Sequence, residues 1–223
     1  MERGLIVVPI GPLQSNMYII TGESGIFIID PSVSLEATEE FLREIPDFYG
    51  ISRGKADVKA LLLTHGHHDH IKYVDKWNEV YPEAVIFFSS NDKMLLSDGF
   101  MNCSYMEGYN TVYGYEFTDV AGKDGSSVFK DGDTEITVLE TPGHTMGSVC
   151  CLIVINGEKM LFTGDTVFSG SVGRTDMPGG SSKILAESIR KISKLDPGLE
   201  IFPGHGPDSN VGDERKNNPF FAV

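Results

Sequence analysis

All six histidines of this chain stand in the same kind of position. Each lies in a glycine-rich or polar turn that directly follows a run of residues typical of a β-strand. Four belong to the run His-Gly-His-His-Asp-His at 65–70, and the others are His144 and His205, each preceded by Pro-Gly. If each histidine had its own structural role, we would expect some of them to lie on helices or elsewhere on the surface. The pattern therefore favours a shared role as metal ligands at the ends of strands.

The strands that precede these turns fall into two groups. Residues typical of strands cover 5–10, 16–21, 25–30, 58–63 and 84–89 in the first group, and 135–140, 148–155, 159–163 and 199–202 in the second. Asn156-Gly157 marks a two-residue hairpin turn. Apolar residues at helical spacing predict helices over 34–45, 71–80 and 181–195, and we expect 91–130 to be a helix start followed by a long loop. This order predicts two packed sheets with helices on their outer faces.

Length, charge and cysteine content narrow the class of protein. A chain of 223 residues fits one domain, spanning 1–223. The net charge of −14 repels phosphate backbones, which argues against nucleic acid as a partner. No apolar run approaches the ~18–20 residues of a membrane-spanning helix, so no membrane association is expected. Cys150 and Cys151 are neighbours whose side chains point to opposite faces of a strand, and with only Cys103 besides them we predict no disulfide scaffold and a cytoplasmic location.

The spacing of the polar residues at 65–70 suits two metal ions. His65 and His67, two residues apart in an extended turn, point to the same side and can bind one ion, while Asp69 and His70 can present ligands to a second. Imidazole and carboxylate ligands suit zinc, iron or manganese better than copper(I). Asp165, in a Gly-Asp-Thr turn after another strand, could bridge two cations ~3.5–4 Å apart.

The motif His-x-His-x-Asp-His, followed by separate His, Asp and His residues, closely resembles the metallo-β-lactamase superfamily of metallohydrolases. The resemblance covers residues 64–205. It implies an α+β fold, a four-layer αββα sandwich with the metal site at one edge. It also implies three sets of ligands: His65, His67 and His144 for one metal, Asp69, His70 and His205 for the other, and Asp165 as the bridge. His68 falls at a variable position of the motif.

Within the superfamily, three short runs resemble the glyoxalase II (hydroxyacylglutathione hydrolase) branch in its short form. They are Gly143-His144-Thr145, the run Gly-Asp-Thr-Val-Phe at 164–168, and Gly-Arg-Thr-Asp at 173–176. The resemblance implies hydrolysis of a small-molecule thiolester such as S-2-hydroxyacylglutathione, by a hydroxide that bridges two divalent cations, with zinc favoured and iron or manganese possible. Asp69 would additionally orient that hydroxide. In agreement, the chain has no Gly-x-Ser-x-Gly nucleophile motif.

The chain departs from the glyoxalase II pattern at the residues that contact glutathione. Arg174 keeps a basic residue of the branch, but Asp176 stands where the branch has an aromatic residue, and Pro207 aligns with a tyrosine. The few residues after His205 leave no room for the helical domain that supplies further basic contacts. Thiolester hydrolysis is therefore better supported than glutathione specificity. Arg174 either binds substrate or forms an ion pair with an acidic residue such as Asp176.

Two other functions fit the same residues. Persulfide dioxygenases share the scaffold and the Gly-Arg-Thr-Asp run but bind one iron, here through His65, His144 and Asp165. A non-catalytic, metal-stabilised binding module is the second alternative, although a structural metal site usually needs only four ligands. The aromatic and methionine residues between 94 and 115 either line the entrance for an apolar acyl group or pack the loop onto the sandwich, and we favour packing. The sequence predicts no oligomeric state.

Overall fold

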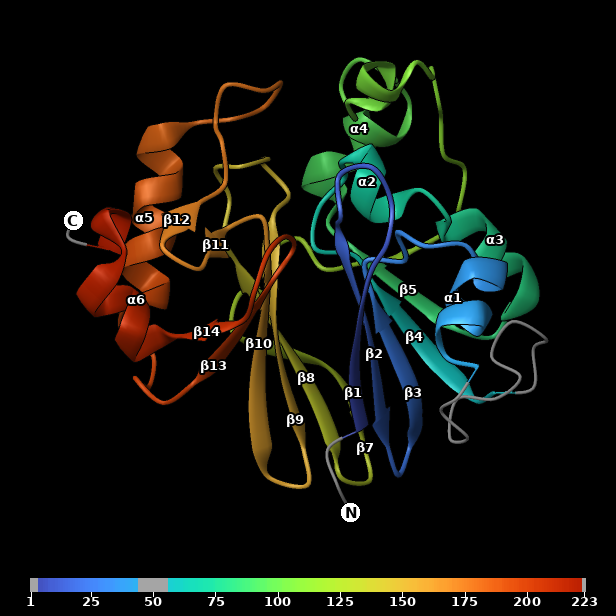
Figure 1. Ribbon diagram of the computed structural model, residues 1–223, viewed down its shortest axis with the longest axis horizontal. Coiled ribbons are helices and arrows are strands. Elements are labelled where there is room, and N and C mark those ends of the chain that lie inside the picture. The colour runs from blue at the N-terminus through green and yellow to red at the C-terminus, as the bar shows by residue number, and fades with distance from the viewer. Residues whose placement is uncertain (1–3, 44–55, 222–223) are drawn as a thin grey trace.

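The computed structural model describes residues 4–43 and 56–221, which form two six-stranded sheets facing each other (Figure 1). In the first sheet the strands follow the order β1 (Gly4–Pro9), β2 (Asn16–Gly22), β3 (Gly25–Ile29), β4 (Val58–Leu62), β5 (Val85–Phe88) and β6 (Thr118–Asp119). In the second they follow the order β14 (Ser209–Asn210), β13 (Glu200–Pro203), β10 (Glu158–Gly164), β9 (Val149–Ile155), β8 (Thr134–Glu140) and β7 (Ser126–Asp131). A small hairpin pairs β11 (Val167–Phe168) with β12 (Ser171–Val172).

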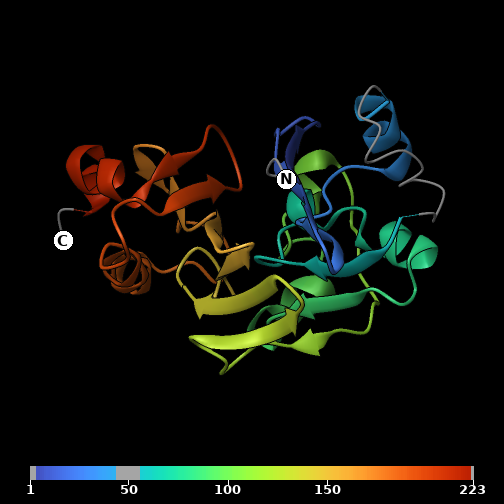
Figure 2. The ribbon, with the colours of Figure 1, turned by 90° about the horizontal axis from the view of Figure 1, so that it is seen from below.

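Helices cover the outer faces of both sheets, as Figures 1 and 2 show. Beside the first sheet lie α1 (Leu35–Phe41), α2 (His68–Ile71), α3 (Val74–Val80) and α4 (Lys93–Leu96), and beside the second lie α5 (Ser182–Ile192) and α6 (Val211–Asn217). Short 3₁₀ turns occupy Ser90–Asp92, Ser104–Glu107 and Pro219–Phe221. The structure thus confirms the predicted four-layer αββα sandwich.

Three clusters of apolar side chains fill the spaces between the four layers. One lies between the first sheet and its helices, where the fully buried Trp77 of α3 donates a hydrogen bond from its indole nitrogen to the Val33 carbonyl at 2.9 Å. The second lies between the sheets, where Phe27 of β3 meets Phe129 of β7 edge-on, with ring centroids 5.1 Å apart. The third lies beneath α5. Cys151 belongs to the second cluster and Cys150 to the third, which confirms that they point to opposite faces, and all three cysteines are free.

Strand direction creates one edge where polar loops gather. Strands β3, β4, β5 and β6 are parallel neighbours, and so are β10 and β13. The carboxyl ends of parallel strands lie at the same edge of a sheet, and contacts of His70, after β4, with Asp165, after β10, and His205, after β13, show that these edges of the two sheets lie side by side. The buried strands β3 and β4 are almost wholly apolar, because one face of each meets the helices and the other meets the second sheet.

The predicted elements agree with the structure except in a few segments. In the segment 91–130 the predicted helix start is confirmed by α4, but the predicted long loop was wrong where β6 and β7 lie. Ser126–Asp131 is a largely exposed edge strand without the apolar signal of its neighbours. Within the predicted helix 34–45, α1 begins after the Ser34 cap and ends at Phe41, and residues 44–45 lie outside the described part. Asn156 and Gly157, with φ of 52° and 81°, form the predicted hairpin turn.

Across residues 4–43 and 56–221, no helix is long and apolar enough to cross a bilayer.

Truncation of Phe27 to alanine should destabilise the fold by about 3–5 kcal/mol, because it empties a site between the two sheets. Urea unfolding at equilibrium measures this. As a control, Phe220→Ala removes a ring that is half-exposed and should change the free energy of unfolding by about 0.5 kcal/mol or less. Equal effects of the two substitutions would contradict the packing of the sandwich core.

Candidate metal centre

The fold brings all seven predicted ligands together at one edge. His65, His67, Asp69 and His70 follow β4, in the loop and first turn of α2. The remaining three come from the second half of the chain: His144 from the loop between β8 and β9, Asp165 from the end of β10, and His205 from the end of β13. The cluster therefore lies between the two halves of the sandwich, at the ends of the strands.

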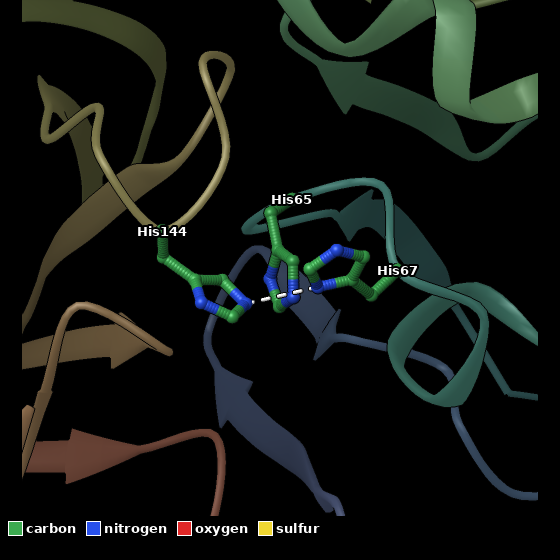
Figure 3. A group of neighbouring side chains, drawn as sticks. All are labelled: His65, His67 and His144. Atoms are coloured by element: carbon green, nitrogen blue, oxygen red, sulfur yellow. Dashed lines mark hydrogen bonds between the residues drawn. The ribbon is translucent and has the colours of Figure 1, made fainter. Parts of the chain in front are cut away.

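The first group consists of His65, His67 and His144, whose rings converge from two loops (Figure 3). The Nδ1 atom of His67 lies 2.9 Å from the Nε2 atom of His144. One ring nitrogen from each of the three residues lies within 4.8 Å of the others, and all three side chains are buried. The group can therefore present three nitrogen ligands to a single ion.

The second group consists of Asp69, His70 and His205. The Nε2 atoms of His70 and His205 are 3.2 Å apart, and Oδ2 of Asp69 lies 3.3 Å from Nε2 of His205 and 3.6 Å from Nε2 of His70. These atoms also lie within 4.8 Å of one another. The group offers two nitrogen ligands and one oxygen ligand.

Asp165 reaches both groups with its carboxylate. Its Oδ2 atom lies 3.5 Å from Nε2 of His144 in the first group and 3.7 Å from Nε2 of His205 in the second. Its Oδ1 atom lies 3.3 Å from Nε2 of His70. Asp165 therefore lies between the two groups, where the predicted bridging ligand would be.

The residues fit two divalent ions. Two ligands of a tetrahedral ion, each about 2.0–2.1 Å from it, are separated by roughly 3.3 Å. The separations given above, between ligand atoms of the two groups and Asp165, run from 2.9 to 3.7 Å and bracket that value. In addition, His65 Nε2 and Asp165 Oδ1 are buried polar atoms without a hydrogen-bond partner among the described residues. Buried polar atoms are normally paired, so bound cations would satisfy these two. The assignment of one ion to each group stays a prediction.

The charge states of the ligands also suit cations. Burial lowers the pKa of His65 far below its ordinary value and that of His67 to about 3, so both imidazoles are neutral. Although burial opposes ionisation of Asp69 and Asp165, the neighbouring histidines lower the pKa of both carboxyls, that of Asp165 to about 2. For His70 burial is outweighed by Asp69, Asp165 and Asp30, which raise its pKa well above the usual value. This concentration of negative charge around His70 would equally favour a bound cation.

Hydrogen bonds to the other ring nitrogens fix the orientation of the ligands. His144 donates from Nδ1 to the Arg174 carbonyl at 2.8 Å, and His205 donates from Nδ1 to the Leu13 carbonyl at 3.0 Å. Such contacts hold a ring nitrogen toward a metal and raise its basicity. They leave Nε2 of both residues directed at the centre.

Asp30 supports His70 and was not predicted from the sequence. It follows β3 with φ of 49°, accepts hydrogen bonds from the backbone and hydroxyl of Thr64 at 2.8 and 2.7 Å, and accepts one from His70 Nδ1 at 2.8 Å. It also lies near His65, but its oxygens already serve these donors, so we interpret it as a support for ligands. The Asp-Pro pair directly after a strand was the available signal.

Asp92 is a second support that the sequence did not indicate. It is fully buried before α4 and accepts hydrogen bonds from Gly66 N at 2.9 Å, Thr145 Oγ1 at 2.7 Å and Gly147 N at 2.6 Å. Gly66 lies between His65 and His67, and Thr145 follows His144. A Cβ atom on Gly147 would lie 2.5 Å from Asp92 Cγ, so glycine permits this approach. One carboxylate thus joins the two loops that carry the first group.

Two other residues of the sequence analysis lie beside the centre. His68 points away from the ligands: its Nδ1 atom lies 2.5 Å from the Tyr113 hydroxyl, in agreement with its variable position in the motif. Arg174 forms two hydrogen bonds to Asp176, at 2.7 and 2.8 Å, and both side chains are exposed. The ion pair considered for Arg174 is therefore present, and its role in substrate binding stays a prediction.

Comparison with known proteins agrees with this geometry. A family model described as "Metallo-beta-lactamase superfamily" matches residues 10–205. The chain belongs to this superfamily. It is 30% identical to hydroxyacylglutathione hydrolase GloC of Haemophilus influenzae, over 96% of each chain.

Two solved structures share the whole architecture. The structure of the BLEG-1 B3 metallo-beta-lactamase is 30% identical, with a TM-score of 0.83, and the match covers 98% of this chain and 100% of that one. The structure of TTHA1623 in a di-iron-bound form is 28% identical, with a TM-score of 0.77 and coverage of 96% and 99%. These relatives establish the fold and the superfamily, and the names of GloC and BLEG-1 point to different substrates.

Substitution of Asp92 by asparagine should weaken binding of one of the two ions by about 10–100-fold, because the amide cannot accept all three hydrogen bonds that align the loops of His65, His67 and His144. Competition with a coloured chelator measures both affinities. The control is Asp196→Asn, which alters an exposed carboxylate that accepts a hydrogen bond from Gly198 N at 2.8 Å, between α5 and β13. Unchanged affinity for both ions would show that Asp92 does not position the ligands.

Proposed function

We propose that this protein is a dinuclear metal-dependent hydrolase of thiolesters such as S-2-hydroxyacylglutathione. The observation that carries the proposal is the convergence of seven ligand residues into two groups with Asp165 between them. A structural site for a single ion would need only four protein ligands, and these would leave no coordination position open to substrate. The similarity to GloC supports thiolesters as the substrate class.

The chain's residues prepare the centre for hydrolysis. Two divalent ions held there would supply a hydroxide near neutral pH and polarise the thiolester carbonyl. His70, His144 and His205 hold their positions through the hydrogen bonds described above. Asp69 remains ionised because His70 and His205 lower its pKa, and its Oδ2 atom accepts a hydrogen bond from Ser15 Oγ at 2.8 Å. In this fixed orientation Asp69 can accept a hydrogen bond from the attacking water and direct it at the carbonyl.

The identity of the ions and the partners form part of the same proposal. Nitrogen and oxygen ligands suit zinc, iron and manganese, zinc is our first choice, and the di-iron form of TTHA1623 supports iron as well. The partner is a small-molecule thiolester, with neither nucleic acid nor membrane, in agreement with the net charge of −14. A cytoplasmic location fits three cysteines that are all free.

Hydrolysis of β-lactams is a second candidate. It is favoured by one observation, the 30% identity to the BLEG-1 enzyme over nearly the whole of both chains. Both reactions deliver water to an acyl carbon, so the same centre could serve either. Parallel assays with S-lactoylglutathione and a chromogenic cephalosporin separate the two candidates.

The first test is replacement of His144 by alanine, which should lower kcat/KM for S-lactoylglutathione by about three orders of magnitude, since a lost metal removes several kcal/mol of transition-state stabilisation. The far-ultraviolet circular dichroism spectrum should be unchanged. The control lies in the same motif as the ligands: His68→Asn alters a histidine directed at Tyr113 and should retain both ions. A fully active His144→Ala enzyme would refute the assignment.

Metal stoichiometry tests the dinuclear centre against the persulfide dioxygenase alternative. Protein purified without added metal or a histidine tag should contain about two equivalents of zinc, iron or manganese per chain. Elemental analysis by plasma mass spectrometry gives the number. One equivalent of iron, together with oxygen uptake on glutathione persulfide, would instead favour a site built from His65, His144 and Asp165.

A further inference from the structure

An exposed group of large apolar side chains lies on residues 98–112. The exposed fractions of Phe100, Tyr105, Met106 and Tyr109 are 58%, 50%, 56% and 55%. The rings of Phe100 and Tyr105 stack with centroids 5.2 Å apart, which gives them a defined arrangement. The expectation that these residues pack the loop onto the sandwich was therefore wrong for Phe100, Tyr105 and Met106, whereas the half-exposed Tyr109 also contacts His68 and Lys72. We call Phe100, Tyr105, Met106 and Tyr109 the apolar rim.

One end of the segment that carries the apolar rim borders the second metal group. The backbone of this segment is fixed to the ligand motif, because the Asn102 carbonyl accepts a hydrogen bond from the amide of His68 at 2.8 Å. Glu107 and Lys72 form an ion pair at 2.5 Å and line a cavity of about 100 Å³ together with Leu13 and Asp69. Glu107 belongs to the same 3₁₀ turn as Tyr105 and Met106. This turn therefore lies across the cavity from the loop before β2, and the cavity extends to the carboxylate of Asp69.

The same segment also reaches the side of the first metal group. Cys103 Sγ lies 3.9 Å from Met177 Sδ, on the loop whose Arg174 carbonyl holds His144. The segment therefore crosses the entrance from the side of Asp69 to the side of His144. Exposed apolar side chains continue around the centre at Leu13, whose carbonyl accepts from His205, and at Met146, two residues after His144.

The cations at this entrance are already paired. Lys72 is paired with Glu107, and Arg174 is held by both carboxylate oxygens of Asp176. An anionic group of a substrate would have to displace a carboxylate from either cation, against the field of a chain with a net charge of −14. The entrance therefore favours an apolar group over an anionic one.

We propose that the apolar rim binds the acyl group of the substrate and that the protein prefers thiolesters with medium-length aliphatic or aromatic acyl groups over short hydroxyacyl ones. This inference rests on the proposed thiolester hydrolysis. The segment that carries the rim lies beside both metal groups, so an acyl chain extending from the centre along this segment would bury its methylenes against the rim and remove apolar surface from water. Phe100 and Tyr105 are then residues that determine specificity.

The test is a series of S-acyl-N-acetylcysteamine thiolesters, from acetyl to octanoyl, hydrolysed by the metal-loaded enzyme. Since the rim is only half-buried, kcat/KM should rise by about two-fold per added methylene, below the roughly four-fold of complete burial. In a Phe100→Ala/Tyr105→Ala variant this dependence on chain length should become nearly flat. The control, Val85→Ala, trims an exposed side chain at the amino end of β5, on the opposite edge of the sheet, and should keep the wild-type dependence.

A matched series of S-acyl glutathiones separates the acyl group from the thiol. A rise in kcat/KM with chain length in both series supports the apolar rim, whereas hydrolysis without any dependence on chain length overturns it and leaves thiolester hydrolysis standing. If the double variant changes the oligomeric state in light scattering but keeps the chain-length dependence, the rim is a contact between copies of the chain and the inference is wrong.

If no thiolester is hydrolysed, the proposed function is refuted, and binding of a thioether then tests the apolar rim without any reaction. S-octyl-N-acetylcysteamine has no scissile bond, and calorimetry should show that it binds at least ten-fold more tightly than the S-methyl compound to the wild type but not to the double variant. Equal affinities for the two compounds would overturn the apolar rim independently of any activity.

Discussion

The candidate centre depends on hydrogen bonds that join the two sheets at the edge where their strands end. Asp92 accepts from Gly66 on one side and from Thr145 and Gly147 on the other, which fixes the loop after β4 against the loop before β9. On the opposite side of the centre, Asn16 N donates to the Gly204 carbonyl at 2.7 Å, next to His205. Ligands that come from both halves of the chain can meet only if these bonds hold the halves in register.

Burying many polar groups costs free energy, which explains why residues such as Asp30 and Asp92 make at least as many hydrogen bonds as the candidate ligands that they hold in place. Burial raises the pKa of the Asp69 and Asp165 carboxyls, yet the surrounding histidines lower it further, so both groups stay ionised. Among the described residues, the atoms left without a partner include His65 Nε2 and Asp165 Oδ1, both directed into the centre. Supports such as Asp30 therefore hold the ligands in a costly arrangement that bound cations would stabilise.

The sequence predicted which residues gather at the centre better than it predicted the residues that support them. A local signal, the residue types and their spacing, identifies His65, His67, Asp69 and His70. The strand patterns place the other three candidates in equivalent turns: His144, Asp165 and His205. Asp92 carries no such signal: a single aspartate before a short helix is typical of a cap, and its partners Thr145 and Gly147 are more than fifty residues away. The edge strand β7 and the exposed rings of Phe100 and Tyr105 were missed for a related reason, since their environment is decided by tertiary structure.

The candidate ligands and the exposed side chains around the entrance lie in different parts of the fold. The candidate ligands occupy short turns at strand ends, where a shift of one residue would disrupt the centre. The exposed side chains of residues 98–112 contribute no candidate ligand and can vary without moving the centre. Relatives that share nearly the whole fold carry names as different as hydroxyacylglutathione hydrolase and B3 metallo-beta-lactamase. Fold and ligands therefore specify the type of chemistry but leave the substrate open. Substrate choice must then lie in the loops around the entrance, and in this chain Phe100 and Tyr105 make that entrance apolar.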